Sequence, residues 1–327
     1  MTGPLTWPQS IHASLSQLLN GLARDCPKLV NDAALGQRLS ELARQLHSEG
    51  AGPLESVAPG WSLDQALLLA TAARNLLETI RSVGGPELGG DTAAGLSEAL
   101  ELLYLKLGAA LRQEQAHRVR GLYVIIDPEV TGGRHPLDIA RGAVRGGARM
   151  LQLRDKLRDK GESLPLAIAL QELCQSNDVL LIINDHVDLA AAVGSGGVHV
   201  GQTDLPVAQA RQVLAPHQVL GRSNREFQQL VESQEMGADH VAFGPIYQSG
   251  TKSTGRQPQG PQRLRQAREL AKVPLVAIGG INSENVAPVV EAGADAICVT
   301  AAVGAAPDPE AAASRLVEVI RDAGGKV

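Results

Sequence analysis

The segment QLRDK, residues 152–156, carries side chains that could bind an anion. In a strand, alternation would point Gln152, Arg154 and Lys156 to one side and Asp155 to the other. Arg can grip a phosphate group with paired N–H donors, and Lys adds a compact positive charge. The motif therefore predicts a phosphate site, although solvated surface charge is the alternative for this segment taken alone.

Two aspartates, Asp185 in INDHVDLA and Asp204 in GVHVGQTDLP, each follow a short apolar run. Carboxylates from neighbouring strands can hold Mg²⁺, which keeps waters and bridges them to phosphate oxygens. Either aspartate alone would more often be a helix cap. The pair is therefore a candidate Mg²⁺ site, and we interpret His199 in the second motif as a hydrogen-bonded core histidine rather than a catalytic base.

Two later loops also suit phosphate groups. The loop GPIYQSGTKSTG offers hydroxyls and one cation that could close over a diphosphate, on Ser249, Thr251 and Lys252. Glycine allows close approach of a ligand to the backbone, and barrels often bind phosphate through backbone amides after their last two strands. The residues expected there are Gly279, Gly280, Val299 and Thr300.

These candidates follow apolar runs of strand length that alternate with helix-length segments. The runs are residues 122–126, 150–153, 180–183, 197–200, 219–221, 240–243, 274–278 and 296–299. Eight buried strands within about 205 residues match a (β/α)8 TIM barrel, with an open doubly wound sheet as the alternative. We expect the barrel to span residues 121–327, with its active site at the C-terminal strand ends.

Residues 1–112 show helical spacing instead, which predicts a small all-α domain before the α/β barrel. A helix is expected over residues 33–47, behind a cap at Asn31 or Asp32, and Ser62 with Gln65 forms a capping-box signature for another. Asp91 is a candidate cap for the last helix. Residues 113–120 are the expected linker, or else the frayed end of that helix.

The composition narrows the classes of function. The formal net charge is -5 and no basic cluster is present, so we expect no nucleic-acid partner. No membrane-length apolar run and no signal peptide are evident, which predicts a cytoplasmic protein that does not bind membranes. Three cysteines without paired spacing indicate buried, reduced thiols.

Read in order, QLRDK, INDHVDLA, GVHVGQTDLP, GPIYQSGTKSTG and AIGGIN with GADAICVTAAV resemble the successive motifs of the thiamine-phosphate synthase family. The resemblance covers nearly all of residues 121–305. It implies a transferase of thiamine biosynthesis with two small-molecule substrates, hydroxymethylpyrimidine diphosphate and hydroxyethylthiazole phosphate. The implied reaction is dissociative: diphosphate leaves, a carbocation forms, and the thiazole nitrogen attacks it.

The resemblance also implies roles for individual residues. Asp185 and Asp204 would hold Mg²⁺, and Lys156, Lys252 and Ser223 would be catalytic. The pyrimidine diphosphate would contact Gln152, Arg154, Lys156, Asn184, Ser223, Ser249, Thr251 and Lys252. The thiazole phosphate would contact Gly279, Gly280, Val299 and Thr300.

The segment GRSNR, residues 221–225, departs from the family pattern, which more often has a small residue before the serine and a histidine after it. Ser249 stands where a threonine is usual, which keeps the hydroxyl. The alternatives are a thiazole tautomerase, whose proton-transfer histidine would fall at Arg225, and a non-catalytic sensor of thiamine precursors. Arg is a poor base, which disfavours the tautomerase.

The helical segment faintly resembles a domain fused to some thiamine-phosphate synthases that is proposed to act on the pyrimidine phosphate. Its arginine and glutamate pattern survives at best as Arg74 and Glu78. Loss of that activity is therefore the favoured interpretation. Packing, substrate handover or formation of a homo-oligomer are the remaining uses for such a bundle.

Overall fold

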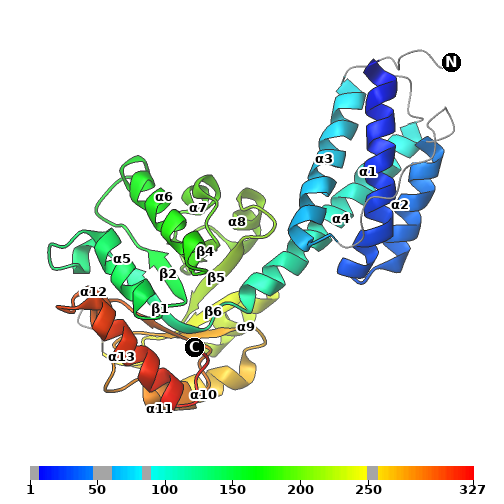
Figure 1. The fold of residues 1–327 in the computed structure, drawn as a ribbon. Helices are drawn as coiled ribbons and strands as arrows, with labels where there is room; N and C mark the ends of the chain where they lie inside the picture. Colours follow the sequence, from blue (N-terminus) through cyan, green and yellow to red (C-terminus); the bar gives the residue numbers. More distant parts are fainter. Residues whose placement is uncertain (1–6, 47–60, 83–89, 249–256) are drawn as a thin grey trace. The chain divides into compact units, whose positions relative to one another are not determined.

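The computed structural model describes residues 7–46, 61–82, 90–248 and 257–327 (Figure 1). The chain folds as two compact units, Met1–Leu111 and Arg112–Val327. Each unit has its own hydrophobic core. None of the helices in the described ranges is long and apolar enough to cross a membrane.

The first unit is helical, as the sequence predicts. Its described helices are α1 (Trp7–Leu29), α2 (Ala33–Leu46), α3 (Leu63–Ser82) and α4 (Gly90–Ala116). The core consists mainly of leucine and alanine side chains at helical spacing, and on α4 these include Leu96, Leu100, Leu103 and Leu107. Since α4 continues to Ala116, the first half of the expected linker 113–120 is the last turn of this helix.

The helix starts follow from local hydrogen bonds. Leu35 N donates to Asp32 Oδ1 at 3.0 Å, so Asp32 rather than Asn31 is the cap of α2. Ser62 N donates to Gln65 Oε1 at 3.0 Å and Gln65 N donates to Ser62 Oγ at 3.3 Å, which confirms the capping box. Asp91 is not the cap of α4, because the helix already begins at Gly90 and places this carboxylate in the first turn. His47, the predicted end of α2, lies outside the described residues.

The second unit is a closed barrel of eight parallel strands (Figure 1). The strands are β1 (Gly121–Ile126), β2 (Met150–Leu153), β3 (Leu180–Asn184), β4 (Gly197–Val200), β5 (Val219–Asn224), β6 (His240–Phe243), β7 (Leu275–Ile278) and β8 (Ala296–Val299). Because β1 pairs with both β2 and β8, the open-sheet alternative is excluded. The expected run 219–221 was too short: β5 continues through polar residues to Asn224.

Helices connect the strands and cover the outside of the barrel. They are α5 (Pro136–Arg145), α6 (Lys160–Ser176), α7 (Val187–Val193), α8 (Val207–Val213), α9 (Phe227–Glu235), α10 (Gly260–Leu270), α11 (Ala287–Glu291), α12 (Ala301–Gly304) and α13 (Pro309–Asp322). A short 3-10 helix, Pro128–Val130, follows β1. The repeated strand-then-helix order places every strand's C-terminal end on one side of the barrel.

Alternate strand residues face the barrel interior. On β1, Tyr123 and Ile125 belong to the inner core, whereas Leu122 and Val124 pack in the larger core that includes the surrounding helices. Since the period of a strand is two, Gln152 on β2 shares the inward side with Met150. Inward-facing polar residues near the C-terminal strand ends, such as Gln152, therefore lie above an interior filled by apolar side chains.

At the opposite, N-terminal end of the barrel, two aspartates make similar contacts that hold neighbouring strands together. Asp239 accepts a hydrogen bond from Leu220 N at 2.7 Å and pairs with Arg211. Asp295 accepts from Leu275 N at 2.9 Å and pairs with Arg268 at 2.6 Å. Asp239 thus joins the start of β6 to β5, and Asp295 joins the start of β8 to β7. Both sets of contacts stabilise the barrel.

All three cysteines are buried, as the sequence predicts. Burial, together with the nearby Asp25 carboxylate, raises the pKa of the Cys26 thiol to about 12. Burial likewise raises the pKa of Cys174 to about 12. Both thiols therefore remain protonated and unreactive at neutral pH.

Candidate active site

The strand end after β2 lies beside polar groups from β1. Gln152 is only 3% exposed, and its amide donates to Tyr123 Oη at 2.5 Å. Arg154 pairs with the buried Asp127 and lies 3.5 Å from a Glu129 carboxylate oxygen. Tyr123, Asp127 and Glu129 were not predicted from the sequence, although Asp127 directly follows an apolar run, as a residue at a strand end does.

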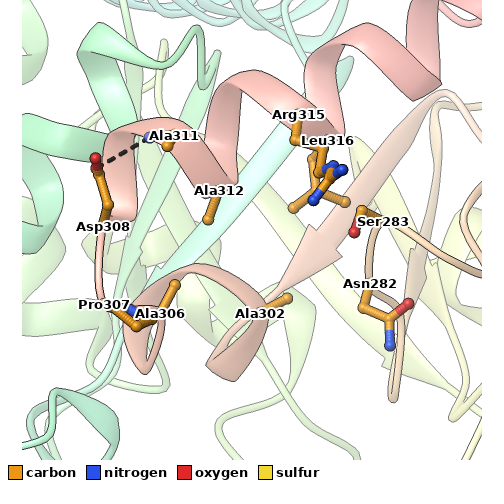
Figure 2. A pocket seen from close by; sticks show the side chains of 10 residues that line it. All are labelled: Asn282, Ser283, Ala302, Ala306, Pro307, Asp308, Ala311, Ala312, Arg315 and Leu316. Atoms are coloured by element: carbon orange, nitrogen blue, oxygen red, sulfur yellow. Dashed lines mark hydrogen bonds between the residues drawn. The ribbon is translucent and has the colours of Figure 1, made fainter.

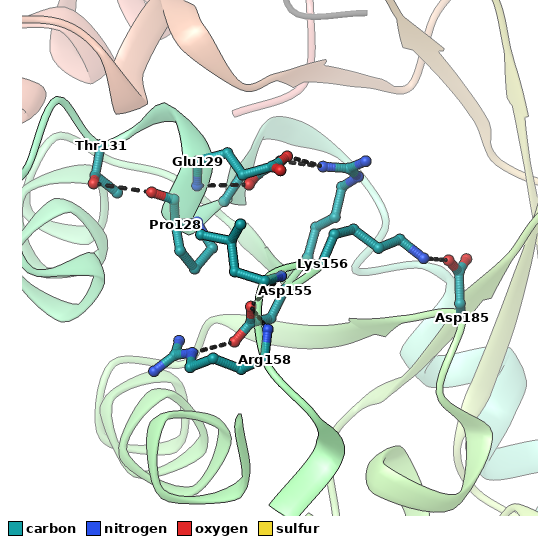
Figure 3. Close-up of polar contacts among 10 residues, drawn as sticks. Pro128, Glu129, Thr131, Asp155, Lys156, Arg158 and Asp185 are labelled. Carbon is teal, nitrogen blue, oxygen red and sulfur yellow. Dashed lines mark hydrogen bonds and ion pairs between the residues drawn. The ribbon is translucent and has the colours of Figure 1, made fainter. Parts of the chain in front are cut away.

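Asp155 faces away from this group (Figure 3). Its carboxylate accepts hydrogen bonds from Ser163 Oγ at 2.7 Å, Arg158 Nε at 2.7 Å and Leu157 N at 3.1 Å. Burial raises the pKa of Asp155, but these hydrogen bonds and the charge of Arg158 outweigh it and keep the pKa below its ordinary value. Asp155 therefore stabilises the turn into α6, while its neighbours on either side remain at the site.

Lys156 reaches across to the next strand end. Its Nζ lies 2.5 Å from Asp185 Oδ2, as Figure 3 shows. Asp185 has a left-handed φ of 62°, an uncommon backbone for a residue other than glycine. Burial raises the pKa of Asp185, but the hydrogen bonds with Lys156 and Asp204 and the Lys156 charge hold it below its ordinary value.

The pKa of Asp204 is shifted in the opposite direction, above its ordinary value. Burial raises its pKa, and the neighbouring Asp185 carboxylate raises it further, against a hydrogen bond from Gly201 N at 2.6 Å. Two carboxylates that share one hydrogen bond cannot both ionise readily. Such a pair fits a hard divalent cation, which would replace the shared proton.

This pair is small for a metal centre. No group of three or more His, Cys, Asp or Glu side chains suited to a metal occurs among the described residues. A cation held only by Asp185 and Asp204 would keep waters or take substrate oxygens, which is the coordination that Mg²⁺ prefers. The donor set thus fits Mg²⁺ better than a metal that needs a complete protein cage.

Three further polar side chains, those of Ser223, His199 and His240, contact one another inside the barrel. Ser223 Oγ lies 2.8 Å from His199 Nε2, and His199 Nδ1 lies 3.5 Å from His240 Nε2. Asn184, at the end of β3, is in register with His199. The strand register therefore brings the predicted Asn184 and Ser223 together around a histidine that sequence analysis placed in the core.

The loops after β7 and β8 form a second candidate anion site. Gly279 and Gly280 both have left-handed φ values, 104° and 64°. A Cβ on Gly279 would lie 2.6 Å from Pro245 Cβ, and one on Gly280 would lie 2.4 Å from Gln248 O. Because Ile278 pairs with Cys298, the glycines adjoin the strand end at Val299 and Thr300.

The remaining predicted residues divide into two groups. Ser249, Thr251 and Lys252 lie outside the described residues. The atypical segment 221–225 does have a defined structure: Arg222 Nη2 donates to Gln202 Oε1 at 3.2 Å, and Gln202 Nε2 donates to Ser223 O at 2.7 Å. Arg222 is thus linked through Gln202 to the backbone of Ser223 on the same strand, β5.

A hollow of about 370 Å³ lies beside α13 (Figure 2). Its polar lining comes from Asn282, Ser283, Asp308 and Arg315, and the rest is largely alanine and proline. Asp308 already caps α13 through hydrogen bonds from Glu310 N and Ala311 N, each 3.0 Å long. None of the candidate site residues lines this hollow, although Asn282 and Ala302 each lie two residues after a candidate, Gly280 and Thr300.

Together, the fold and the site define a TIM-barrel enzyme with a carboxylate pair and two candidate anion sites at its strand ends. The chain belongs to the thiamine monophosphate synthase family, whose model matches residues 122–303. The family resemblance in the sequence motifs is thus confirmed, and the chain is a transferase of thiamine biosynthesis.

Similar proteins support this membership. A thiamine-phosphate synthase of Moorella thermoacetica is 42% identical over 63% of this chain and 98% of its own length. The thiamine phosphate pyrophosphorylase structure from Pyrococcus furiosus matches with a TM-score of 0.59 and 31% identity, over 64% of this chain and 99% of that one.

One relative extends the match beyond the barrel. The thiamine biosynthesis bifunctional protein ThiM/ThiE of Symbiobacterium thermophilum is 36% identical over 82% of this chain and 51% of its own length. That coverage exceeds the barrel segment, so it includes part of the helical unit. This chain spans about half of that relative.

Proposed function

We propose that the barrel joins hydroxymethylpyrimidine diphosphate to hydroxyethylthiazole phosphate, giving thiamine phosphate and diphosphate. Family membership supports this reaction, and one structural observation carries it to particular residues. Lys156, Asp185 and Asp204 meet at the end of the barrel that also carries the Gly279–Gly280 turn. Two phosphorylated substrates require two adjacent anion sites of this kind.

The diphosphate end of the pyrimidine substrate occupies the site around Arg154 and Lys156 in this proposal. Both cations are paired with carboxylates, Arg154 with Asp127 and Lys156 with Asp185. Mg²⁺ held by Asp185 and Asp204 would neutralise charge on the leaving diphosphate. Lys156 then exchanges Asp185 for a diphosphate oxygen, and Lys252 adds a third positively charged side chain.

The pyrimidine ring binds above the barrel interior, against Gln152, Asn184 and Ser223. The bond between the methylene carbon and the diphosphate oxygen breaks, and its electron pair leaves with the diphosphate. The thiazole nitrogen then donates its lone pair to the methylene carbocation. No proton moves in either step, so the chemistry depends on charge stabilisation and alignment rather than on a general base.

The thiazole phosphate binds at the second anion site. Backbone groups of Gly279, Gly280, Val299 and Thr300 surround its oxygens in this proposal. A Cβ on either glycine would collide with the loop after β6, so the turn that presents these groups requires glycine. Placing this phosphate on the strand ends beside β1 directs the thiazole ring towards the methylene carbon. The effect is to convert an encounter of two substrates into an aligned pair.

The test is product formation by the full chain with both substrates and Mg²⁺, alongside calorimetric titration of each substrate. We expect thiamine phosphate and diphosphate in equal amounts, and none when Mg²⁺ or either substrate is omitted. Binding of both substrates without turnover would support the sensor alternative. Isomerisation of the thiazole phosphate without coupling would support the tautomerase alternative.

A further inference from the structure

The interior of the barrel contains two histidines in line with Ser223. His240 begins β6 and is fully buried, and its Nε2 lies 3.5 Å from Nδ1 of His199 on β4. His199 Nε2 lies 2.8 Å from Ser223 Oγ on β5. The three side chains therefore form one row that runs from the middle of the barrel to the candidate substrate site.

A glycine makes room for this row. Gly221 lies between the two rings, in register with both His199 and His240. A Cβ there would lie 2.0 Å from His240 Nε2 and 2.5 Å from His199 Nδ1. A side chain at this position would separate the rings, so the first residue of the atypical segment 221–225 is what permits their contact.

The inner histidine is neutral. Burial first, and then the neighbouring His199 and Arg211, lower the pKa of His240 well below its ordinary value. A neutral imidazole has one N–H and one acceptor nitrogen. Its Nδ1 is buried and has no hydrogen-bond partner among the described residues. A buried N–H without an acceptor is rarer in proteins than an acceptor without a donor, which favours the proton on Nε2.

We propose that His240 is a positioning residue that fixes His199 in one tautomer and so makes the Ser223 hydroxyl a donor towards substrate. His240 Nε2–H faces His199 Nδ1, which must then be an acceptor. His199 carries its proton on Nε2 and donates it to Ser223 Oγ. The Ser223 O–H is left to donate outwards, and the matching substrate atom is an acceptor such as a pyrimidine ring nitrogen.

Only this last step rests on the proposed function. The opposite tautomer would make Ser223 donate inwards to His199 and leave its oxygen to accept from a substrate amino group. The position of one buried proton thus decides which edge of the pyrimidine ring the site accepts.

The tautomers are measured directly by long-range 1H–15N NMR of the ligand-free full chain with labelled histidines. The chain has 8 histidines, and spectra of His240→Gln and His199→Gln assign the two that matter. We expect neutral rings protonated at Nε2 for both. A proton on Nδ1 of either ring would overturn the proposal, whatever reaction the enzyme catalyses.

Kinetics test the last step. His240→Leu removes the donor and keeps an apolar side chain of similar size, whereas His240→Gln returns an amide N–H near the Nε2 position. We expect about a tenfold rise in KM for the pyrimidine diphosphate with Leu, little change in KM for the thiazole phosphate, and recovery to within about threefold with Gln. Unchanged kinetics in His240→Leu, or no recovery with Gln, would contradict the positioning role.

The proposed function and the histidine proposal can be refuted independently of each other. A wild-type chain that makes no thiamine phosphate refutes the proposed function but leaves the NMR result standing. Should His240→Leu fail to fold, the NMR experiment alone decides the proposal, because it uses the wild-type chain.

Discussion

The two ends of the barrel use aspartate in opposite ways. At the N-terminal end, Asp239 and Asp295 each accept from a strand N–H and pair with an arginine. At the C-terminal end, Asp185 and Asp204 lie against one another, and their pKa values move in opposite directions. Each N-terminal carboxylate has an arginine partner, whereas the C-terminal pair has Lys156 on Asp185 and a backbone N–H, from Gly201, on Asp204.

This difference separates stability from function within one domain. Paired carboxylates with hydrogen-bonded backbone partners stabilise the closed barrel and have little left to bind. A carboxylate pair costs stability, and such strained charge is retained where a substrate or cation uses it. Removing a charge should therefore have different consequences at the two ends of the barrel.

The largest effect is expected at the C-terminal end. Asp185→Ala and Lys156→Ala should each lower turnover by at least about two orders of magnitude, because each removes charge that complements the leaving diphosphate and its cation. Steady-state product formation measures this, with circular dichroism to confirm folding. Near-normal rates in either folded variant would refute the assigned roles.

The matched control is Asp295→Asn at the other end. It weakens the contacts with Arg268 and Leu275 N, and should lower the free energy of unfolding by about 1 to 3 kcal/mol. Urea unfolding measures the loss, and turnover per folded molecule should remain close to that of the wild type. A hundredfold fall in turnover with unchanged stability would erase the distinction between the two ends.

Asp204→Asn should have a smaller effect, and it should raise the free energy of unfolding where Asp295→Asn lowers it. The amide still accepts from Gly201 N but no longer repels Asp185, so the metal-free chain should gain up to about 1 kcal/mol of stability. The same change should abolish any rise in melting temperature caused by Mg²⁺. A variant that melts lower than the wild type in a metal chelator would contradict the repulsion.

The smallest effect is expected in the helical unit. Arg74, the candidate functional residue there, pairs with Glu101 at 2.6 Å and lies over the Tyr104 ring at 4.3 Å. Arg74→Gln should change turnover by less than about twofold and stability by about 0.5 kcal/mol, as partly exposed ion pairs contribute little. A large loss of turnover would show that this unit takes part in the chemistry.

Much of the barrel could be predicted from the sequence because buried strands form short apolar runs. The runs for β2, β4, β6 and β8 have the observed bounds, whereas β5 was cut short because Arg222, Ser223 and Asn224 are polar. The strand-end rule then placed Asp185 and Asp204 on neighbouring strands. These features depend on local sequence alone.

Contacts between strands could not be predicted in the same way. The pairing of Arg154 with Asp127 depends on how β1 lies beside β2, and the His199–His240 contact depends on the register of three strands around Gly221. Neither partner in these pairs has a local sequence signal that identifies the other. The sequence therefore indicates which residues reach the site but not which charges already compensate one another there.

The most direct test of the contrast between the ends is anomalous diffraction from crystals grown with Mn²⁺ and diphosphate, since Mn²⁺ shares the oxygen ligands of Mg²⁺. We predict a manganese peak about 2.0 to 2.2 Å from a carboxylate oxygen of both Asp185 and Asp204, with diphosphate beside it and Lys156 turned towards the diphosphate. A well-diffracting crystal with diphosphate bound but no metal on this pair, or with the metal on Asp239 or Asp295, would contradict the account.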